Sequence, residues 1–226
     1  MTSDFSISRE PSVKAYSLDR ASIEPVYALD LHAGLSYLDL CAAPGGKSLM
    51  ATFLTKGEMQ MHLNDSSKDR VQRLKAVLHD YLPSPMVGKM RITCSDGSRM
   101  GLRARETFDR VLADVPCSAE RHHLRDNKID TWSLKQSKRL AVRQHALLCS
   151  ALDATVSGGQ VVYSTCSLSP LENDGVIRRL MESRNGRFSV IPHRAEMGEA
   201  TELGTLILPD RFPSYGPIYY SVLSKV

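Results

Sequence analysis

The chain has 226 residues, of which 42% are hydrophobic and 24% charged, with 14 glycines and 11 prolines. These proportions are typical of one globular domain and exclude a low-complexity tail or a repeat array. No apolar run reaches the roughly 18 to 20 residues of a membrane-spanning helix, and the first twenty residues lack the apolar centre of a signal peptide, so we expect no membrane association.

Charge and cysteine content exclude further classes. The balance of 29 Lys and Arg against 25 Asp and Glu gives a net charge of +4, which by itself identifies no partner. The five cysteines, at 41, 94, 117, 149 and 166, fit neither a zinc site nor a disulfide framework, so we expect no metal and reduced thiols. Five acidic and three basic side chains among the first thirty residues argue against an intact mitochondrial transit peptide.

Short apolar runs alternate with longer helical patterns from residue 35 onward. The predicted strands are, in chain order, 36–40, 59–64, 90–94, 108–115, 160–165, 205–208 and 218–223. The predicted helices are 47–55, 68–81, 134–156 and 170–181, and Gly158 and Gly159 are expected to cap the third of them. This alternation predicts a Rossmann-like α/β fold with a mostly parallel sheet of about seven strands flanked by helices.

A loop of small residues, 41–46, lies between the first predicted strand and the first predicted helix. The backbone of such a loop can approach a ligand at the carboxyl edge of the sheet. A phosphate-binding loop would require glycine six residues before Lys47, where this chain has Cys41. For the pair Gly45 and Gly46 alone, a tight turn without a ligand remains an alternative.

Two acidic residues follow neighbouring predicted strands. Asp65 ends the second strand twenty residues after Gly45, where an acid of a doubly wound fold accepts hydrogen bonds from ribose hydroxyls. Asp96 and Gly97 follow the third strand, where an acid can contact the edge of an adenine. Each acid alone is more often a cap or turn residue, but together, without a G-x-G-x-x-G motif, they favour S-adenosylmethionine over a dinucleotide.

Two cysteines follow the fourth and fifth strands, in Asp114-Val115-Pro116-Cys117 and Ser164-Thr165-Cys166, so both thiols are expected at the cofactor edge. A thiolate there could add to carbon 6 of a pyrimidine and so make carbon 5 nucleophilic towards a methyl donor. A nearby Lys or Arg would favour the thiolate. Cys94 and Cys149, inside a strand and a helix, are interpreted as small buried hydrophobic residues.

Asp114 would hydrogen-bond the ring N3 and the exocyclic amine of the target base. In that role it carries a proton or shares one with N3, and burial beside an apolar strand end would raise its pKa in the required direction.

The motifs CAAPGGKS, NDSSKDR, CSDGS, DVPCSAERH and VVYSTCSLSPLEN resemble, in order and spacing, those of the Nop/Sun RNA cytosine-5 methyltransferases. The resemblance covers residues 16–226, which would form one methyltransferase catalytic domain after a short N-terminal extension, 1–15. The runs YSLDRASIEPVYALDLHAG and GTLILPDRFPSYGPIYY look most like the mitochondrial ribosomal-RNA member. The resemblance therefore implies methylation of cytidine in structured RNA, as in mitochondrial small-subunit ribosomal RNA, within the mitochondrial matrix.

The family resemblance also implies roles for individual residues. Cys166 corresponds to the nucleophile, and Cys117 to the cysteine that helps release the product. The implied cofactor-binding residues, including the loop residues, are Cys41, Ala42, Pro44, Gly45, Gly46, Lys47, Asp65, Arg70, Asp96, Gly97 and Asp114.

A basic segment follows Cys117, with seven Lys and Arg residues against three acids between 120 and 145. Arg121, Arg125 and Lys128 are candidate contacts to RNA phosphates, whereas the basic residues of 135–143 equally suit a solvated helix face. Trp132 fits the core better than a stacking platform, and His122 and His123 are not assigned a catalytic role. The target cytosine must be unpaired or flipped, because a duplex hides carbons 5 and 6.

Many family members carry a longer N-terminal RNA-binding module before the catalytic domain, which is expected to begin at residue 16 in this chain. The resemblance implies that an mTERF-type helical-repeat protein partner could supply RNA-binding surface instead. Two alternatives remain open: the same chemistry on transfer RNA, and a mitochondrial ribosome-assembly factor in which methylation is secondary.

Overall fold

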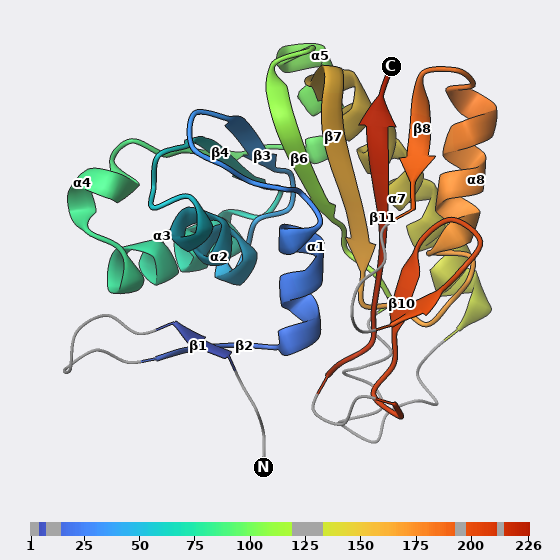
Figure 1. Cartoon of the computed structure of the whole chain (residues 1–226), viewed down its shortest axis with the longest axis horizontal. Helices are drawn as coiled ribbons and strands as arrows, with labels where there is room; N and C mark the ends of the chain where they lie inside the picture. The colour runs from blue at the N-terminus through green and yellow to red at the C-terminus, as the bar shows by residue number, and fades with distance from the viewer. Residues whose placement is uncertain (1–4, 8–14, 119–132, 193–197, 212–214) are drawn as a thin grey trace.

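The computed structural model describes residues 15–118, 133–192, 198–211 and 215–226, together with the backbone of 5–7. Nine of its described strands form one sheet with the order β5-β4-β3-β6-β7-β11-β10-β9, in which β8 also pairs with β11. The strands from β3 to β7 pair in parallel, and β8 to β11 are added antiparallel. The predicted mostly parallel α/β sheet is therefore confirmed (Figure 1).

The strands of this sheet lie close to their predicted positions. Their bounds are β3 Ser36–Asp39, β4 Gln60–Asp65, β5 Arg91–Cys94, β6 Phe108–Asp114, β7 Thr155–Thr165, β8 Phe188–Ile191, β9 Glu199–Ala200, β10 Thr205–Ile207 and β11 Ile218–Lys225. All seven predicted strands are present. The sequence missed β8 and β9, which have only four and two residues and extend the antiparallel part.

Helices cover both faces of the sheet (Figure 1). The α-helices are α1 Glu24–Tyr27, α2 Gly46–Leu54, α3 Lys68–Tyr81, α4 Ser84–Val87, α5 Met100–Arg103, α7 Leu134–Ala154 and α8 Asp174–Ser183; the 3₁₀ helices are η1 Arg20–Ile23 and η2 Gly97–Arg99. Alternate residues of β3 point to opposite faces. Tyr37 packs in the core with α1 to α3, and Leu38 packs in the core with α7 and α8.

Three predicted boundaries are wrong: the end of α7, the start of β7 and the start of α8. Helix α7 ends at Ala154 rather than after Val156, because Thr155 is already extended and begins β7. Gly158 does have a positive φ of 77°, but it lies in an irregular part of β7 where the register against β6 shifts, not at a helix cap. Helix α8 begins at Asp174, four residues after the predicted start.

The N-terminal region includes a hairpin in which β1 Phe5–Ile7 pairs antiparallel with β2 Tyr16–Leu18. Part of the predicted extension is therefore a strand, and the domain boundary at residue 15 stays a prediction. Of the helices that the structure describes, none is long and apolar enough to cross a membrane.

Candidate active site

A small cavity lies at the carboxyl edge of the parallel strands, beside the loop between β3 and α2. Its volume is about 170 Å³. The structure gathers seven of the predicted cofactor-binding residues around it: Cys41, Ala42, Pro44, Gly45, Gly46, Lys47 and Asp114. Tyr16, Leu18 and Ser22 complete one side, so β2 and the segment after it also shape the cavity.

The two glycines of the loop permit close packing on opposite sides. Gly45 precedes α2 with a φ of 119°, and a Cβ atom there would lie 3.0 Å from the Leu74 side chain of α3. A Cβ atom on Gly46 would lie 2.8 Å from the Leu18 side chain and 2.9 Å from that of Tyr16. The loop is thus pressed between α3 and β2, which explains why residues without side chains occupy these positions.

Asp65 and Arg70 hold the loop from the side of β4 and α3. Asp65 is 1% exposed, and its Oδ2 accepts from Ala43 N at 3.3 Å and pairs with Arg70 Nη1 at 3.2 Å. Arg70 also donates to the Ala43 carbonyl, and Ser67 N donates to Asp65 Oδ1 at 3.1 Å. Asp65 is therefore already engaged by the protein, and its bond from Ser67 N is a turn contact, the alternative that the sequence offered beside a ribose contact.

The other two predicted cofactor residues follow β5 at the same sheet edge but do not line the cavity. Asp96 is exposed and caps η2 by accepting from Ser98 N at 3.0 Å and Ser98 Oγ at 2.9 Å. Gly97 is buried, and a Cβ atom there would lie 3.0 Å from the Leu147 side chain and 3.1 Å from that of Leu40. Close packing against α7 thus accounts for this glycine.

A third acid, Asp39 at the end of β3, lines the cavity and was not predicted from the sequence. Its side chain is 1% exposed and accepts from Ser48 Oγ at 2.7 Å, whereas Oδ1 has no partner in hydrogen-bonding geometry. Burial raises the pKa of Asp39 to about 7, with the Ser48 hydrogen bond acting against it and the Asp114 carboxylate adding to it. An acid inside an otherwise apolar strand was the available sequence signal.

Asp114, at the end of β6, is held by two donors. Lys47 Nζ donates to its Oδ2 at 2.8 Å, and Ser164 Oγ of β7 donates to its Oδ1 at 2.7 Å. Burial acts to lower the pKa of Lys47, but the Asp114 carboxylate outweighs it, so this pKa lies above its ordinary value. The sequence led us to expect Asp114 buried beside an apolar strand end, whereas its side chain is 30% exposed and paired with the ammonium group that α2 brings to it.

The two strand-end cysteines meet beside this ion pair. Cys117 Sγ and Cys166 Sγ lie 2.8 Å apart, and both side chains are half-buried and outside any disulfide. Cys166 is close enough to contribute to the raised pKa of Lys47. The structure therefore brings together two thiols, an ammonium and a carboxylate at the ends of β6 and β7.

A buried carboxylate, Glu172, fixes the loop that carries Cys117. Glu172 is 0% exposed, and its oxygens accept from Ser118 N at 3.0 Å, Ser118 Oγ, and Gln144 Nε2 at 2.8 Å. Gln144 Nε2 also donates to the Pro116 carbonyl at 2.9 Å. The residues on both sides of Cys117 are thus bound to one acid and one amide.

The next residue, Asn173, fixes the loop that carries Cys166. Its Oδ1 accepts from Thr165 Oγ1 at 2.7 Å, and its Nδ2 donates to the Ser167 carbonyl at 3.0 Å. The two loops are joined where Ser118 Oγ and Ser167 Oγ lie 3.1 Å apart. Glu172 and Asn173 stand inside the motif VVYSTCSLSPLEN but received no role from sequence reasoning, and Gln144 had no local signal.

The remaining cysteines are separate from this pair. Burial raises the pKa of Cys41, and the Asp39, Asp65 and Asp114 carboxylates add to that effect, so the thiol stays neutral. Burial also raises the pKa of the half-buried Cys149. Cys94 is exposed, and the prediction that it is buried was wrong because β5 is the edge strand of the sheet.

The predicted RNA contacts Arg121, Arg125 and Lys128, with His122, His123 and Trp132, lie outside the described residues. The other basic residues of this region are on α7 and exposed, as a solvated helix face would be: Lys135, Lys138, Arg139 and Arg143. Within the described ranges, no three His, Cys, Asp or Glu residues group as they would around a metal ion.

Comparisons with known proteins show the family of the chain. A family profile described as 16S rRNA methyltransferase RsmB/F matches residues 26–223. The chain is 38% identical to the 5-cytosine rRNA methyltransferase NSUN4 of Bos taurus, with 93% of this chain and 59% of the relative covered. It is 36% identical to the mitochondrial tRNA (cytosine(34)-C(5))-methyltransferase of Danio rerio, over 93% of this chain and 60% of the relative.

A solved structure shares the fold. The crystal structure of NSun6 from Pyrococcus horikoshii with SFG superposes with a TM-score of 0.80 at 21% identity, covering 94% of this chain and 53% of that one. The chain therefore spans somewhat more than half the length of the relatives it matches.

Proposed function

Since the chain belongs to the 16S rRNA methyltransferase RsmB/F family, we propose that it is an S-adenosylmethionine-dependent RNA (cytosine-5)-methyltransferase acting on structured RNA. One observation carries the proposal: the Cys117 and Cys166 sulfur atoms lie 2.8 Å apart, beside the ion pair of Lys47 and Asp114. Covalent activation of a pyrimidine requires a thiolate, and a second thiol at this distance can act in the release of the product.

Cys166 is the nucleophile in this mechanism. The Lys47 ammonium favours its thiolate, which forms a bond to carbon 6 of the cytosine while electron density shifts to carbon 5. After carbon 5 is methylated, a base takes its proton, the electron pair of that bond restores the double bond between carbons 5 and 6, and sulfur leaves carbon 6 as the Cys166 thiolate, with Cys117 assisting this release. Asp114 hydrogen-bonds the polar edge of the base and thereby stabilises the adduct.

The cavity residues fit S-adenosylmethionine in two respects. The buried Asp39, whose Oδ1 has no hydrogen-bond partner, lines a cavity made by a glycine loop, and Asp65 and Asp96 lie at the same sheet edge. We propose that Cys41, Ala42, Pro44, Gly45, Gly46, Lys47, Asp65, Arg70, Asp96, Gly97 and Asp114 hold this cofactor. When bound, it supplies an electrophilic methyl group.

We propose mitochondrial small-subunit ribosomal RNA as the substrate and the mitochondrial matrix as the location. The 38% identity to a relative named as an rRNA methyltransferase supports this choice. Transfer RNA is the second candidate, favoured by the 36% identity to the Danio rerio enzyme. Arg121, Arg125 and Lys128 stay proposed phosphate contacts, and an mTERF-type protein stays a proposed partner.

A denaturing gel tests the covalent step. Wild type, Cys117→Ala, Cys166→Ala and the control Cys149→Ala are incubated with S-adenosylmethionine and total mitochondrial RNA. A nuclease-sensitive upward shift is expected only in Cys117→Ala, because addition at carbon 6 survives while release fails. A shift in Cys166→Ala instead would assign the nucleophile to Cys117.

The same samples separate the enzyme from an assembly factor. Cys166→Ala is expected to lose methyl transfer and retain its affinity for S-adenosylmethionine. If Cys166→Ala transfers methyl groups as fast as wild type, the covalent mechanism through this thiol is wrong. If wild type binds the cofactor and RNA but neither methylates RNA nor forms an adduct in Cys117→Ala, the assembly-factor alternative is favoured.

A further inference from the structure

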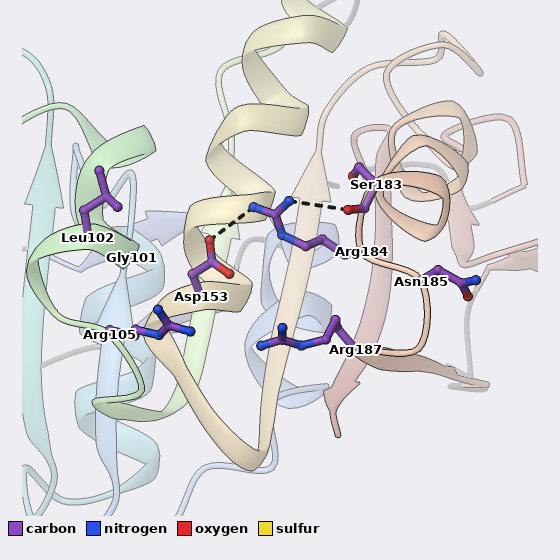
Figure 2. A pocket seen from close by; sticks show the side chains of 8 residues that line it. All are labelled: Gly101, Leu102, Arg105, Asp153, Ser183, Arg184, Asn185 and Arg187. Carbon is purple, nitrogen blue, oxygen red and sulfur yellow. Dashed lines mark hydrogen bonds and ion pairs between the residues drawn. The ribbon is translucent and has the colours of Figure 1, made fainter.

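A second pocket lies at the opposite edge of the sheet from the two thiols. It has a volume of about 560 Å³ and is formed by the ends of α5 and α7 and by the turn between α8 and β8 (Figure 2). Strand β6 runs from this edge to the active site over seven residues, a span of about 20 Å at roughly 3.3 Å per residue. The pocket is thus separate from the cofactor cavity and from the cysteines.

Three guanidinium groups line this pocket, on Arg105, Arg184 and Arg187. Only one carboxylate lines it, and that group, Asp153, is already paired with Arg184 at 3.3 Å. Figure 2 shows the side chains of Arg105 and Arg187 pointing into the pocket from opposite sides. Among the described residues, neither guanidinium has an ion pair or a hydrogen bond.

A further acid, Glu106, is close enough to act on these two arginines electrostatically but is paired with a lysine. Glu106 is hydrogen-bonded to Lys225 at 3.1 Å. Lys225 is the main reason that the pKa of Glu106 lies below its ordinary value, and Arg105 and Arg187 contribute to the same shift. The pocket therefore has an excess of positive charge, carried by two groups that protein partners do not occupy.

We propose that this pocket binds a phosphate of the substrate RNA backbone at a distance from the reacting cytosine. The planar guanidinium fork matches phosphate oxygens in paired hydrogen bonds, and several forks around one concavity suit a phosphodiester better than a single charge does. The inference rests on the proposed function, because a polyanion engaged at the active site has further phosphates available about 20 Å away. Structured RNA can follow the protein over that distance, whereas a short oligonucleotide cannot.

A phosphate contact in this pocket predicts that the effect of pocket substitutions on RNA affinity depends on the length of the RNA. In Arg105→Glu/Arg187→Glu, the affinity for a full small-subunit ribosomal RNA transcript should fall at least tenfold. The slope of log affinity against log salt should become shallower by about 1, because one lost phosphate contact contributes about 0.7 to 0.9. The affinity for an oligonucleotide of a few nucleotides around the target cytosine should stay within about twofold of wild type.

A matched control separates the pocket from net charge. Arg73→Glu/Lys75→Glu makes the same charge change on exposed positions of α3 and should leave the salt slope unchanged. Arg105→Lys/Arg187→Lys keeps both charges without the planar fork, so it should keep most of the salt slope and lose part of the affinity. Cofactor affinity and thermal unfolding of each variant show that the fold is retained.

Each outcome has a definite meaning. If wild type methylates the transcript and the pocket variant binds it with unchanged affinity and salt slope, the pocket inference is overturned and the proposed function stands. An equal loss in the α3 control also overturns the inference, because net charge would then explain the effect. If wild type neither binds nor methylates RNA, both the proposed function and the inference fail.

Discussion

Replacement of Glu172 tests whether one buried acid controls the position of Cys117. In Glu172→Ala, three donors lose their acceptor: Ser118 N, Ser118 Oγ and Gln144 Nε2. A buried donor left without a partner destabilises the fold by about 1 to 3 kcal/mol. Two of these donors keep another neighbour, Ser167 Oγ and the Pro116 carbonyl, so the expected loss of unfolding free energy is about 2 to 5 kcal/mol.

Two assays separate stability from positioning. Thermal unfolding should show a decrease in Tm on the order of 10 °C for Glu172→Ala, since each kcal/mol corresponds to roughly 2 to 4 °C in a domain of this size. Glu172→Gln keeps one acceptor oxygen and should lose about half as much stability. Both variants should accumulate a covalent RNA adduct on a denaturing gel, because a misplaced Cys117 slows release while Cys166 still adds.

The adduct is the deciding result, since a residue with a purely structural role would lower the yield of folded protein without trapping RNA. A Glu172→Gln variant that is folded, turns over at the wild-type rate and shows no adduct would refute the positioning role. A loss of unfolding free energy well below 1 kcal/mol in Glu172→Ala would refute the hydrogen-bond network itself.

Two further predictions concern charge at the cofactor edge. Because the folded pKa of Asp39, about 7, lies above its unfolded value of about 3.9, its stabilising contribution is complete below about pH 4 and is lost as pH rises through 7. Denaturant unfolding of wild type should show that the free energy of unfolding decreases between pH 4 and 8, by at most about 4 kcal/mol from this group. Asp39→Asn should lack this decrease. Equal decreases in the two proteins would refute the role of Asp39. Lys47→Met should shift adduct formation in a Cys117→Ala background to higher pH, because the Cys166 thiolate loses a nearby cation, whereas Lys56→Met at an exposed position should not. Identical pH profiles for the two lysine variants would remove Lys47 from nucleophile activation.

The sequence predicted those parts of the site that follow from chain order. Hydrophobic periodicity located the strands, and the rule that parallel strands end at one edge placed the glycine loop, Asp114, Cys117 and Cys166 together. The structure places the loop and Asp114 around one cavity and the two sulfur atoms 2.8 Å apart. Such predictions succeed because each of these residues directly follows a strand, and the hydrophobic pattern of the adjacent residues predicts that strand.

The residues that support the site could not be predicted in this way. Glu172 binds Ser118 and Gln144, which are 54 and 28 positions away, and no local pattern encodes contacts at such separations. Arg105 comes before α7 in the sequence and Arg187 comes after β7, yet both line one pocket, so their proximity depends on the tertiary fold. The exposure of Cys94 depended likewise on strand order, which made β5 an edge.

The buried network has a consequence for how the two thiols act. Residues on both sides of Cys117 bind Glu172 and Gln144, and residues on both sides of Cys166 bind Asn173. Because Glu172 and Asn173 are consecutive, the two loops share one anchor, and the distance between the sulfur atoms is set before RNA arrives. A site fixed by packed hydrogen bonds loses little entropy when the substrate binds. Addition and release then require the base to move relative to the thiols, rather than the thiols relative to each other.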